Sequence, residues 1–205
     1  MKATIKIGKN KKAEAGVRIG AVSPRAIPHS NLTVGADATL RSGTILYRGT
    51  TIGNRLQTGH NAVIREENRI GDSFSLWTNS IVDYGCTIGN NVKIHCNCYV
   101  AQFTTIEDDV FLAPGVIIAN DPHPGVPDPV PCMKGPTIKK GAQIGCNVTI
   151  LPHVTIGEHA LIGAGSVVTK DVPAYSVAYG NPARAVKKVK DVRCAVRNHR
   201  PYDFL

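Results

Sequence analysis

The sequence predicts an all-β fold, a triangular prism of short parallel strands that wind in coils of 18 residues. Three observations lead to it: an aliphatic residue recurs at every sixth position, a small residue follows four positions later, and turn-forming residues stand between the two. A period of six is not a helical face. Each six-residue unit is therefore expected to be a short strand followed by a corner.

The aliphatic repeat keeps one register from Val34 to Ile118 and, after a change of phase, continues from Ile138 to Val168. Of its 21 positions, 20 are Val, Ile or Leu, and Thr58 is the exception. The first run is Val34, Leu40, Leu46, Ile52, Thr58, Ile64, Ile70, Leu76, Val82, Ile88, Ile94, Val100, Ile106, Leu112 and Ile118. The second run is Ile138, Ile144, Ile150, Ile156, Ile162 and Val168.

The small residues are expected to point inward together with the aliphatic ones. They are Ala38, Thr44, Thr50, Ala62, Ser80, Cys86, Cys98, Thr104, Ala142, Ala160 and Ser166. Turn formers fill the third and fourth places of the unit, as in Asn90-Asn91, Asp108-Asp109, Pro114-Gly115 and Ala164-Gly165. These pairs predict the corners of the prism.

Three strands close one coil, so the repeat predicts seven coils. With ~4.8 Å between stacked strands, the prism would be about 34 Å tall. Val22 and Pro28 fall in the register of Val34. Residues 1–33 are therefore expected to form an N-terminal strand and an irregular first coil, and residues 34–180 the prism.

A proline-rich segment, residues 124–137, separates the two runs of the repeat. Proline cannot continue a ladder of backbone hydrogen bonds, so this segment is expected to loop out of the prism. A long loop in a compact solenoid usually carries function, although a tolerated surface insertion is the alternative.

This pattern resembles the hexapeptide-repeat, or isoleucine-patch, acyltransferases, over roughly Val34 to Arg184. The resemblance implies that the prism winds left-handed, which spacing alone does not predict because general chirality rules favour right-handed crossovers. It also implies an acyl-CoA-dependent enzyme that forms a homotrimer, with the acyl donor bound in grooves between neighbouring prisms.

The C-terminal region, residues 181–205, is expected to be a basic helix and a tail. The segment from Ser176 to Arg184 resembles the Gly-x-Pro-Ala-Arg/Lys ending of the same family. Asn181 then fits a helix N-cap and Pro182 the first helical residue. Four valines recur at near-helical spacing: Val186, Val189, Val192 and Val196. They predict an amphipathic helix from Ala183 to about Asn198.

Stacking by 18 places Tyr84, Gln102 and Asn120 in one exterior column, at the corner that leads to Asp121 and His123. These polar residues are the candidate contact surface for a sugar or amine. Acyl transfer from a thioester requires an amine or hydroxyl that loses its proton, and a neutral imidazole suits that task. Because related acyltransferases carry a His-Pro in such a loop, His123 is the candidate general base.

His95 is the alternate base. It lies at the next corner, stacked over Trp77 and about 13 Å from Gln102, so one subunit does not bring His95 and His123 to one small substrate. A neighbouring subunit would. The resemblance leaves a further alternative open, because some amino-sugar acetyltransferases of this fold use the departing thiolate as the proton acceptor.

For the donor, the resemblance implies that the pantetheine arm of acetyl-CoA lies in the outer groove near the C-terminal coils. Gly145, Ala164 and Gly165 are the candidate backbone contacts. Lys170 and Arg184 are the candidate partners of the coenzyme phosphates.

The run of residues 58–67, followed by residues 70–72, resembles the sugar-nucleotide branch of the family. It implies an acetyl-CoA-dependent N-acetyltransferase of a nucleotide-linked amino sugar. An O-acetyltransferase of serine, maltose or antibiotic type would use the same scaffold.

A γ-class carbonic anhydrase needs three histidines around zinc; His60 and His95 are 35 residues apart, but a third would have to stand near Val100. No metal is expected, and a non-catalytic scaffold fits the histidine-bearing loop poorly.

The net charge of +9 is concentrated at the two ends of the chain. A nucleic-acid-binding protein would carry a basic stripe along its folded body, so no nucleic-acid partner is expected. The six cysteines include no CxxC pair, which is typical of intracellular thiols. No apolar stretch approaches the ~20 residues that cross a bilayer, so we expect a cytoplasmic protein without a membrane partner.

Overall fold

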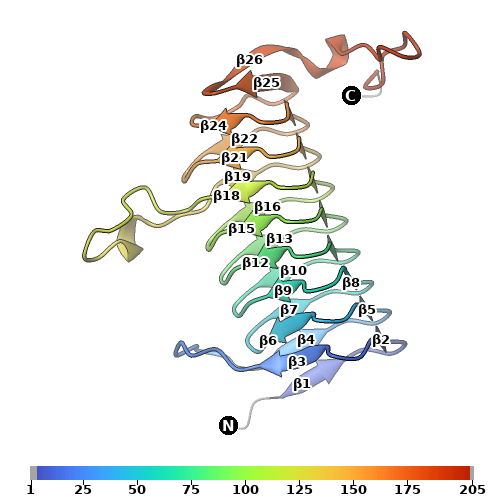
Figure 1. Cartoon of the computed structure of the whole chain (residues 1–205), viewed down its shortest axis with the longest axis vertical. Coiled ribbons are helices and arrows are strands. Elements are labelled where there is room, and N and C mark those ends of the chain that lie inside the picture. Colours follow the sequence, from blue (N-terminus) through green and yellow to red (C-terminus); the bar gives the residue numbers. More distant parts are fainter. Residues whose placement is uncertain (1–3, 204–205) are drawn as a thin grey trace.

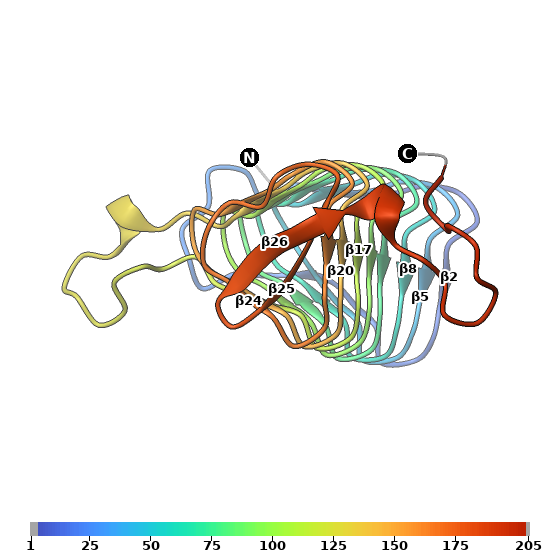
Figure 2. The same ribbon diagram turned by 90° about the horizontal axis from the view of Figure 1, so that it is seen from above.

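The computed structural model of the chain describes residues 4–203. Short strands stack into three sheets, which form the faces of a triangular prism (Figure 1; Figure 2). We name them sheets A, B and C in the order in which the chain meets them. The C–A corner is the set of residues that lead from a strand of sheet C to the next strand of sheet A, and the B–C corner is defined in the same way.

Sheet A contains β1 (Ile5–Ile7), β4 (Leu32–Val34), β7 (Thr51–Ile52), β10 (Arg69–Ile70), β13 (Thr87–Ile88), β16 (Thr105–Ile106), β19 (Thr137–Ile138) and β22 (Thr155–Ile156). Sheet B contains β2 (Lys12–Ala13), β5 (Thr39–Leu40), β8 (Gln57–Thr58), β11 (Ser75–Leu76), β14 (Lys93–Ile94), β17 (Phe111–Leu112), β20 (Gln143–Ile144), β23 (Leu161–Ile162), β25 (Ser176–Gly180) and β26 (Ala183–Lys188). Sheet C contains β3 (Arg18–Ala21), β6 (Ile45–Tyr47), β9 (Val63–Ile64), β12 (Ile81–Val82), β15 (Tyr99–Val100), β18 (Ile117–Ile118), β21 (Thr149–Ile150) and β24 (Val167–Val168).

The strand register confirms the 18-residue coil. Ile70 pairs with Ile52 on one side and Ile88 on the other, in parallel. The aliphatic residues of the repeat are buried and form one continuous core. The exception, Thr58, is buried as well, and its hydroxyl lies 2.8 Å from that of Thr44, so the two polar groups satisfy each other.

The corners adopt the backbone conformation that the turn-forming residues predict. Asn91 has φ 56° and Asp109 φ 60°, in the left-handed region that Asn, Asp and Gly adopt most readily. Gly115 and Gly165 occupy the same conformation, with φ 77° and 71°. These corners let each strand turn into the next sheet.

The prediction for the first coil is wrong in register. The coil begins earlier, at β1, and Ile5 pairs with Leu32, 27 positions away instead of 18. The difference arises because residues 22–31 leave the prism as a loop between β3 and β4, which we call the N-terminal loop. Val22 is therefore 70% exposed, and it does not belong to the core repeat.

A second loop, residues 119–136, leaves the prism between β18 and β19, as the proline-rich segment predicts; Thr137 already belongs to β19. We call it the extruded loop. It contains the short 3-10 helix η1 (Val130–Cys132), and its base is closed by a hydrogen bond from the Lys134 amide to the Asn120 carbonyl. Both loops start from the C–A corner and project on the same side of the prism (Figure 1; Figure 2).

The predicted C-terminal helix is wrong. Ala183–Lys188 forms β26, which pairs antiparallel with β25 across a turn at Asn181-Pro182, and only the 3-10 helix η2 (Val189–Asp191) follows. Valine is a poor helix former, and the edge of β25 offers backbone partners that an isolated helix would not use. Of the predicted apolar stripe, Val189 is buried while Val196 is 91% exposed.

Candidate active site

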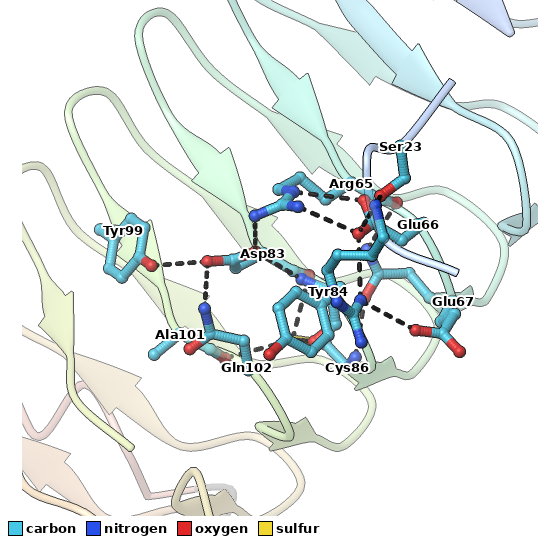
Figure 3. A network of polar contacts seen from close by, with 12 residues as sticks. Ser23, Arg65, Glu66, Glu67, Asp83, Tyr84, Cys86, Tyr99, Ala101 and Gln102 are labelled. Carbon is cyan, nitrogen blue, oxygen red and sulfur yellow. Dashed lines mark hydrogen bonds and ion pairs between the residues drawn. The ribbon is translucent and has the colours of Figure 1, made fainter. Parts of the chain in front are cut away.

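The predicted column at the C–A corner is organised by Asp83, which follows β12 and is 4% exposed. Its Oδ2 accepts hydrogen bonds from the Tyr99 hydroxyl at 2.6 Å and from Gln102 Nε2 at 2.5 Å, and its Oδ1 accepts from Arg65 Nη1 at 2.9 Å (Figure 3). Gln102 Oε1 in turn accepts from Asn120 Nδ2 at 2.7 Å. The predicted column therefore exists, and it is a connected chain of hydrogen bonds.

The carboxylate determines which way the two amides point. Both oxygens of the Asp83 carboxylate accept hydrogen bonds, so Gln102 directs its NH2 group to Asp83 and its carbonyl oxygen to Asn120. Asn120 must then donate its NH2 group. Its Oδ1 is left without a protein donor among residues 4–203, and it lies at the base of the extruded loop.

Two neighbours of Asp83 are held in their ordinary protonation states. Burial and the hydrogen bond to the Asp83 carboxylate raise the pKa of Tyr99, so its hydroxyl stays a donor. Burial works against the charge on Arg65, but the carboxylates of Asp83 and Glu66 outweigh it and raise the pKa of Arg65. Tyr99 therefore stays neutral and Arg65 stays charged across the neutral pH range.

The N-terminal loop is fastened to the same corner through Glu66, whose side chain is fully buried. Glu66 Oε1 accepts from the Ser23 hydroxyl at 2.8 Å and from Arg25 Nη1 at 3.0 Å, and Arg25 also pairs with Glu67 at 3.0 Å. Burial alone would raise the pKa of Glu66, but hydrogen bonds from its own backbone, Ser23 and Arg25 and the charge of Arg65 lower it below its usual range.

Tyr84, predicted to contact substrate, lies between two side chains. The Arg25 guanidinium stacks over its ring at 3.5 Å, and the ring of Phe103 meets it edge-on with centroids 5.5 Å apart. The N-terminal loop thus covers one face of the ring, and Tyr84 remains partly exposed.

His123 and Asp121 lie in the extruded loop, next to Asn120. The Asp121 carboxylate accepts a hydrogen bond from the His123 backbone amide at 2.8 Å, which fixes the turn that carries the imidazole. The His123 side chain is exposed and makes no hydrogen bond within residues 4–203. Farther along, His153 Nε2 lies 2.9 Å from the Cys132 carbonyl and holds the loop against the next coil.

His95 lies at the B–C corner, on the other edge of sheet C from the Gln102 column. His95 lies one coil above Trp77, with ring centroids 6.4 Å apart and the ring planes tilted by 46°, and its ring centroid lies 4.9 Å from that of Phe111. The stacking over Trp77 that the sequence predicts is confirmed, and the aromatic neighbours account for the placement of this ring.

Four of the five candidate donor-binding residues gather near the C-terminal end of the B–C corner. Gly145 lies directly under Ala164, so closely that a Cβ would meet the Ala164 nitrogen at 2.6 Å, and Gly165 follows in an open, exposed turn. Arg184 stands on β26 opposite Tyr179, beside this corner. Lys170 follows β24 and therefore lies at the C–A corner, across the width of sheet C.

The sequence interpretation missed Asp83, Arg65, Glu66 and Arg25. The hexapeptide pattern places acids at corners, where exposure is the default, so it does not reveal that Asp83 and Glu66 are buried. The one available signal is that Asp83 immediately precedes Tyr84 in the predicted column.

In the part of the chain that the structure describes, no group of three or more His, Cys, Asp and Glu side chains is placed to hold a metal ion. Metal independence stays a prediction. Within the same residues, no helix has the length and apolar character to cross a bilayer.

The profile of the bacterial transferase hexapeptide family, with six repeats, matches residues 85–120 and 135–170. Among curated proteins, the chain is 62% identical over 47 residues to dTDP-3-amino-3,6-dideoxy-alpha-D-galactopyranose 3-N-acetyltransferase of Aneurinibacillus thermoaerophilus, covering 23% of this chain and 24% of that protein. It is 40% identical over 95 residues to galactoside O-acetyltransferase of Escherichia coli, covering 42% and 45%. It is 35% identical over 105 residues to a putative acetyltransferase of Schizosaccharomyces pombe, covering 47% and 49%. The chain thus spans a quarter to a half of the length of these relatives.

Two solved structures share the prism over most of its length. A UDP-N-acetylglucosamine acyltransferase from Bacteroides fragilis superimposes with a TM-score of 0.71 at 21% identity, covering 90% of this chain and 72% of that one. A second, from Campylobacter jejuni, gives a TM-score of 0.58 at 17% identity, covering 86% and 75%.

The prism and its repeats define the left-handed parallel β-helix fold that these two acyltransferase structures share. Within this prism, residues 85–120 and 135–170 resemble the hexapeptide-repeat transferase family.

Proposed function

We propose that the protein is an acetyl-CoA-dependent N-acetyltransferase that acts on the amino group of a nucleotide-linked amino sugar. The observation that carries the proposal is the hydrogen-bonded chain from Asp83 through Gln102 to Asn120, which leaves Asn120 Oδ1 as an acceptor beside the loop that bears His123. The named amino-sugar N-acetyltransferase that matches at 62% identity over 47 residues supports the choice of substrate.

In this proposal Asn120 Oδ1 accepts a hydrogen bond from the substrate amine. This hydrogen bond orients the lone pair of the amine nitrogen toward the thioester. The amine nitrogen attacks the thioester carbonyl carbon, the carbon–sulfur bond breaks, and coenzyme A leaves as the thiolate. His123 takes the proton that the nitrogen loses. If no side-chain base acts, the departing thiolate takes that proton.

Acetyl-CoA binding is assigned to Gly145, Ala164, Gly165 and Arg184 at the B–C corner, with Lys170 at the C–A corner. Sheet C separates the two corners, so these five residues form one site only if two prisms share it. We therefore include a homotrimer in the proposal, with Lys170 of one protomer facing the B–C corner of the next.

The outer face of sheet C supports this assembly. It presents an apolar stripe in strand register, while the outer face of sheet A is dominated by threonine. The stripe consists of Ile45, Val63, Ile81, Tyr99 and Ile117. Ile117 is 42% exposed. A stripe of this kind on a monomer is typical of a protein interface.

A second candidate is O-acetylation of a sugar, because galactoside O-acetyltransferase is 40% identical over 95 residues. Release of free thiol from acetyl-CoA should be measured with nucleotide-linked 3-amino and 4-amino sugars, the corresponding hydroxyl sugars, a galactoside and serine. We expect turnover with an amino sugar alone. Turnover with a hydroxyl acceptor alone would favour the second candidate, and no turnover with any of them would contradict both. A cytoplasmic location stays part of the proposal.

A further inference from the structure

A cleft of about 710 Å³ lies between the N-terminal loop and the edge of sheet A, beside the C–A corner. His29 and Asn31 of the loop form one wall, Thr51 and Arg69 of sheet A form the floor, and Glu67 and Phe103 border the corner. None of these residues takes part in the acyl-transfer chemistry proposed above. The volume lies within the range of pockets that bind drug-sized ligands.

The wall of the cleft is held in place before any ligand binds. The Arg25 guanidinium joins the N-terminal loop to Glu66 and Glu67, each at 3.0 Å, and the Gly49 amide donates to the Asn31 carbonyl at 2.9 Å. A pre-organised wall lowers the entropy that binding costs.

The charges of the lining favour an anion. Glu67 is the one acid among the described residues that line the cleft, and it is paired with Arg25, which it shares with Glu66. Arg69 projects from β10 and is exposed, and its guanidinium makes no hydrogen bond or ion pair within residues 4–203. His29 also lacks a side-chain partner there. An unpaired guanidinium presents a fork of donors that matches two phosphate oxygens.

The aromatic ring of Phe103 adds a flat apolar surface. Phe103 is 37% exposed and has a left-handed backbone, φ 60°, a conformation in which bulky residues are uncommon. The edge-on contact with Tyr84 supports the ring from below. A ligand without a base, such as inorganic pyrophosphate, would not use the Phe103 ring, whereas the base of a nucleotide would stack on it.

We propose that this cleft binds the nucleoside diphosphate part of the acceptor, with the diphosphate on Arg69 and His29 and the base against Phe103. The inference rests on the proposed function and specifies how its substrate is held. Phe103 immediately follows Gln102, so the cleft adjoins the C–A corner, where Gln102 and Asn120 lie.

Calorimetric titration of the intact protein with UDP, dTDP and inorganic pyrophosphate tests the assignment without any acetyl transfer. Arg69→Gln should weaken UDP and dTDP binding at least tenfold. Phe103→Asn, which keeps a residue that tolerates positive φ, should weaken nucleotide binding and leave pyrophosphate unchanged. Lys93→Gln is the control, because Lys93 is an exposed cation on the outer face of sheet B and lines neither site.

Unchanged nucleotide affinity in Arg69→Gln, or equal affinity for pyrophosphate and UDP, would overturn the assignment. The two proposals fail separately. Nucleotide binding that depends on Arg69, without acetylation of any sugar, would contradict the proposed function but support the cleft as a nucleotide-binding site. If Arg69→Gln acetylates a nucleotide-linked amino sugar with the wild-type KM, the cleft is not the nucleotide-binding site, while the proposed function is supported.

Discussion

At the scale of single residues, His123 is the group whose removal most directly tests the chemistry. Its imidazole is exposed in the extruded loop that starts beside Asn120, and it has no competing hydrogen bond within residues 4–203. If it is the general base, His123→Ala should lower kcat on the order of 10²- to 10⁴-fold. The affinity for acetyl-CoA should change little, because the donor is assigned to other residues. Steady-state kinetics with both substrates varied measures the two effects.

The matched comparison is His95→Ala, which removes a ring packed between Trp77 and Phe111. We expect it to affect turnover much less. Loss of kcat in His95→Ala with normal kcat in His123→Ala would move the base to the B–C corner. Normal kcat in both would favour proton transfer to the thiolate.

Glu66 is a residue whose ionisation should be visible in stability. Its pKa is lowered in the folded protein, so as the pH falls below the ordinary value of 4.5 the unfolded chain takes up a proton first. The stability that Glu66 contributes is therefore present above pH 4.5 and lost on acidification. Glu66→Gln should cost about 1–3 kcal/mol at pH 7 and flatten the decline in stability that begins as the pH falls toward 4.5.

Urea denaturation at a series of pH values measures that decline. The control is Asp128→Asn, since Asp128 is exposed in the extruded loop and makes no hydrogen bond in the described part of the chain. An acid decline of wild-type steepness in Glu66→Gln would mean that the buried carboxylate is not the group responsible.

At the scale of elements, the N-terminal loop depends on Gly49. This glycine has φ +86°, and a Cβ there would meet the His29 carbonyl oxygen at 2.8 Å. Gly125 has nearly the same backbone, φ +89°, but nothing lies within 4 Å of its Cβ position. Both alanine variants should lose about 1–2 kcal/mol from the left-handed conformation, and Gly49→Ala should lose more because it displaces the loop.

Thermal unfolding followed by circular dichroism compares the two variants. We expect the Tm of Gly49→Ala to be several degrees below that of Gly125→Ala, at about 2–4 °C per kcal/mol for a chain of this size. Equal values would show that the loop does not press on Gly49.

The elements also show where sequence reasoning succeeds and where it fails. The period of six predicted the strands because each inward residue fills the same place in every coil. It misplaced Val22 because an insertion of arbitrary length resets the register without a signal of its own. It misread Ala183–Lys188 as helix because the valine spacing suits a helix, while the free edge of β25 is visible only in three dimensions.

The candidate site was predictable to a similar degree. Gln102 and Asn120 could be aligned because stacking by 18 is a property of the repeat. Asp83 could not be identified as the group that orients them, since its burial depends on Arg65, Tyr99 and neighbouring coils together.

At the scale of the whole molecule, the apolar stripe of sheet C should determine the oligomeric state. Ile81→Glu places a charge in the middle of the stripe and leaves the core untouched, because Ile81 points outward. Light scattering should give three times the 21.9 kDa of one chain for the wild type and a single chain for the variant. Thr87→Glu, on the outer face of sheet A in the same coil, is the control.

Loss of transfer activity together with assembly would fit a site shared between prisms. A trimer that survives in Ile81→Glu would exclude sheet C as its interface, and a monomeric wild type with full activity would exclude the shared site.

The ends of the prism have a consequence of another kind. The first strand of every sheet carries an exposed cation, Lys6 in β1, Lys12 in β2 and Arg18 in β3, and at the opposite end β26 folds back over the edge of β25. A stack of parallel strands with bare ends would accept further molecules end to end, as the growing tip of an amyloid fibril does. Charge at one end and a reversed strand at the other make this short solenoid a poor seed for fibres, even though its cross-section repeats the same hydrogen-bonded layer from coil to coil.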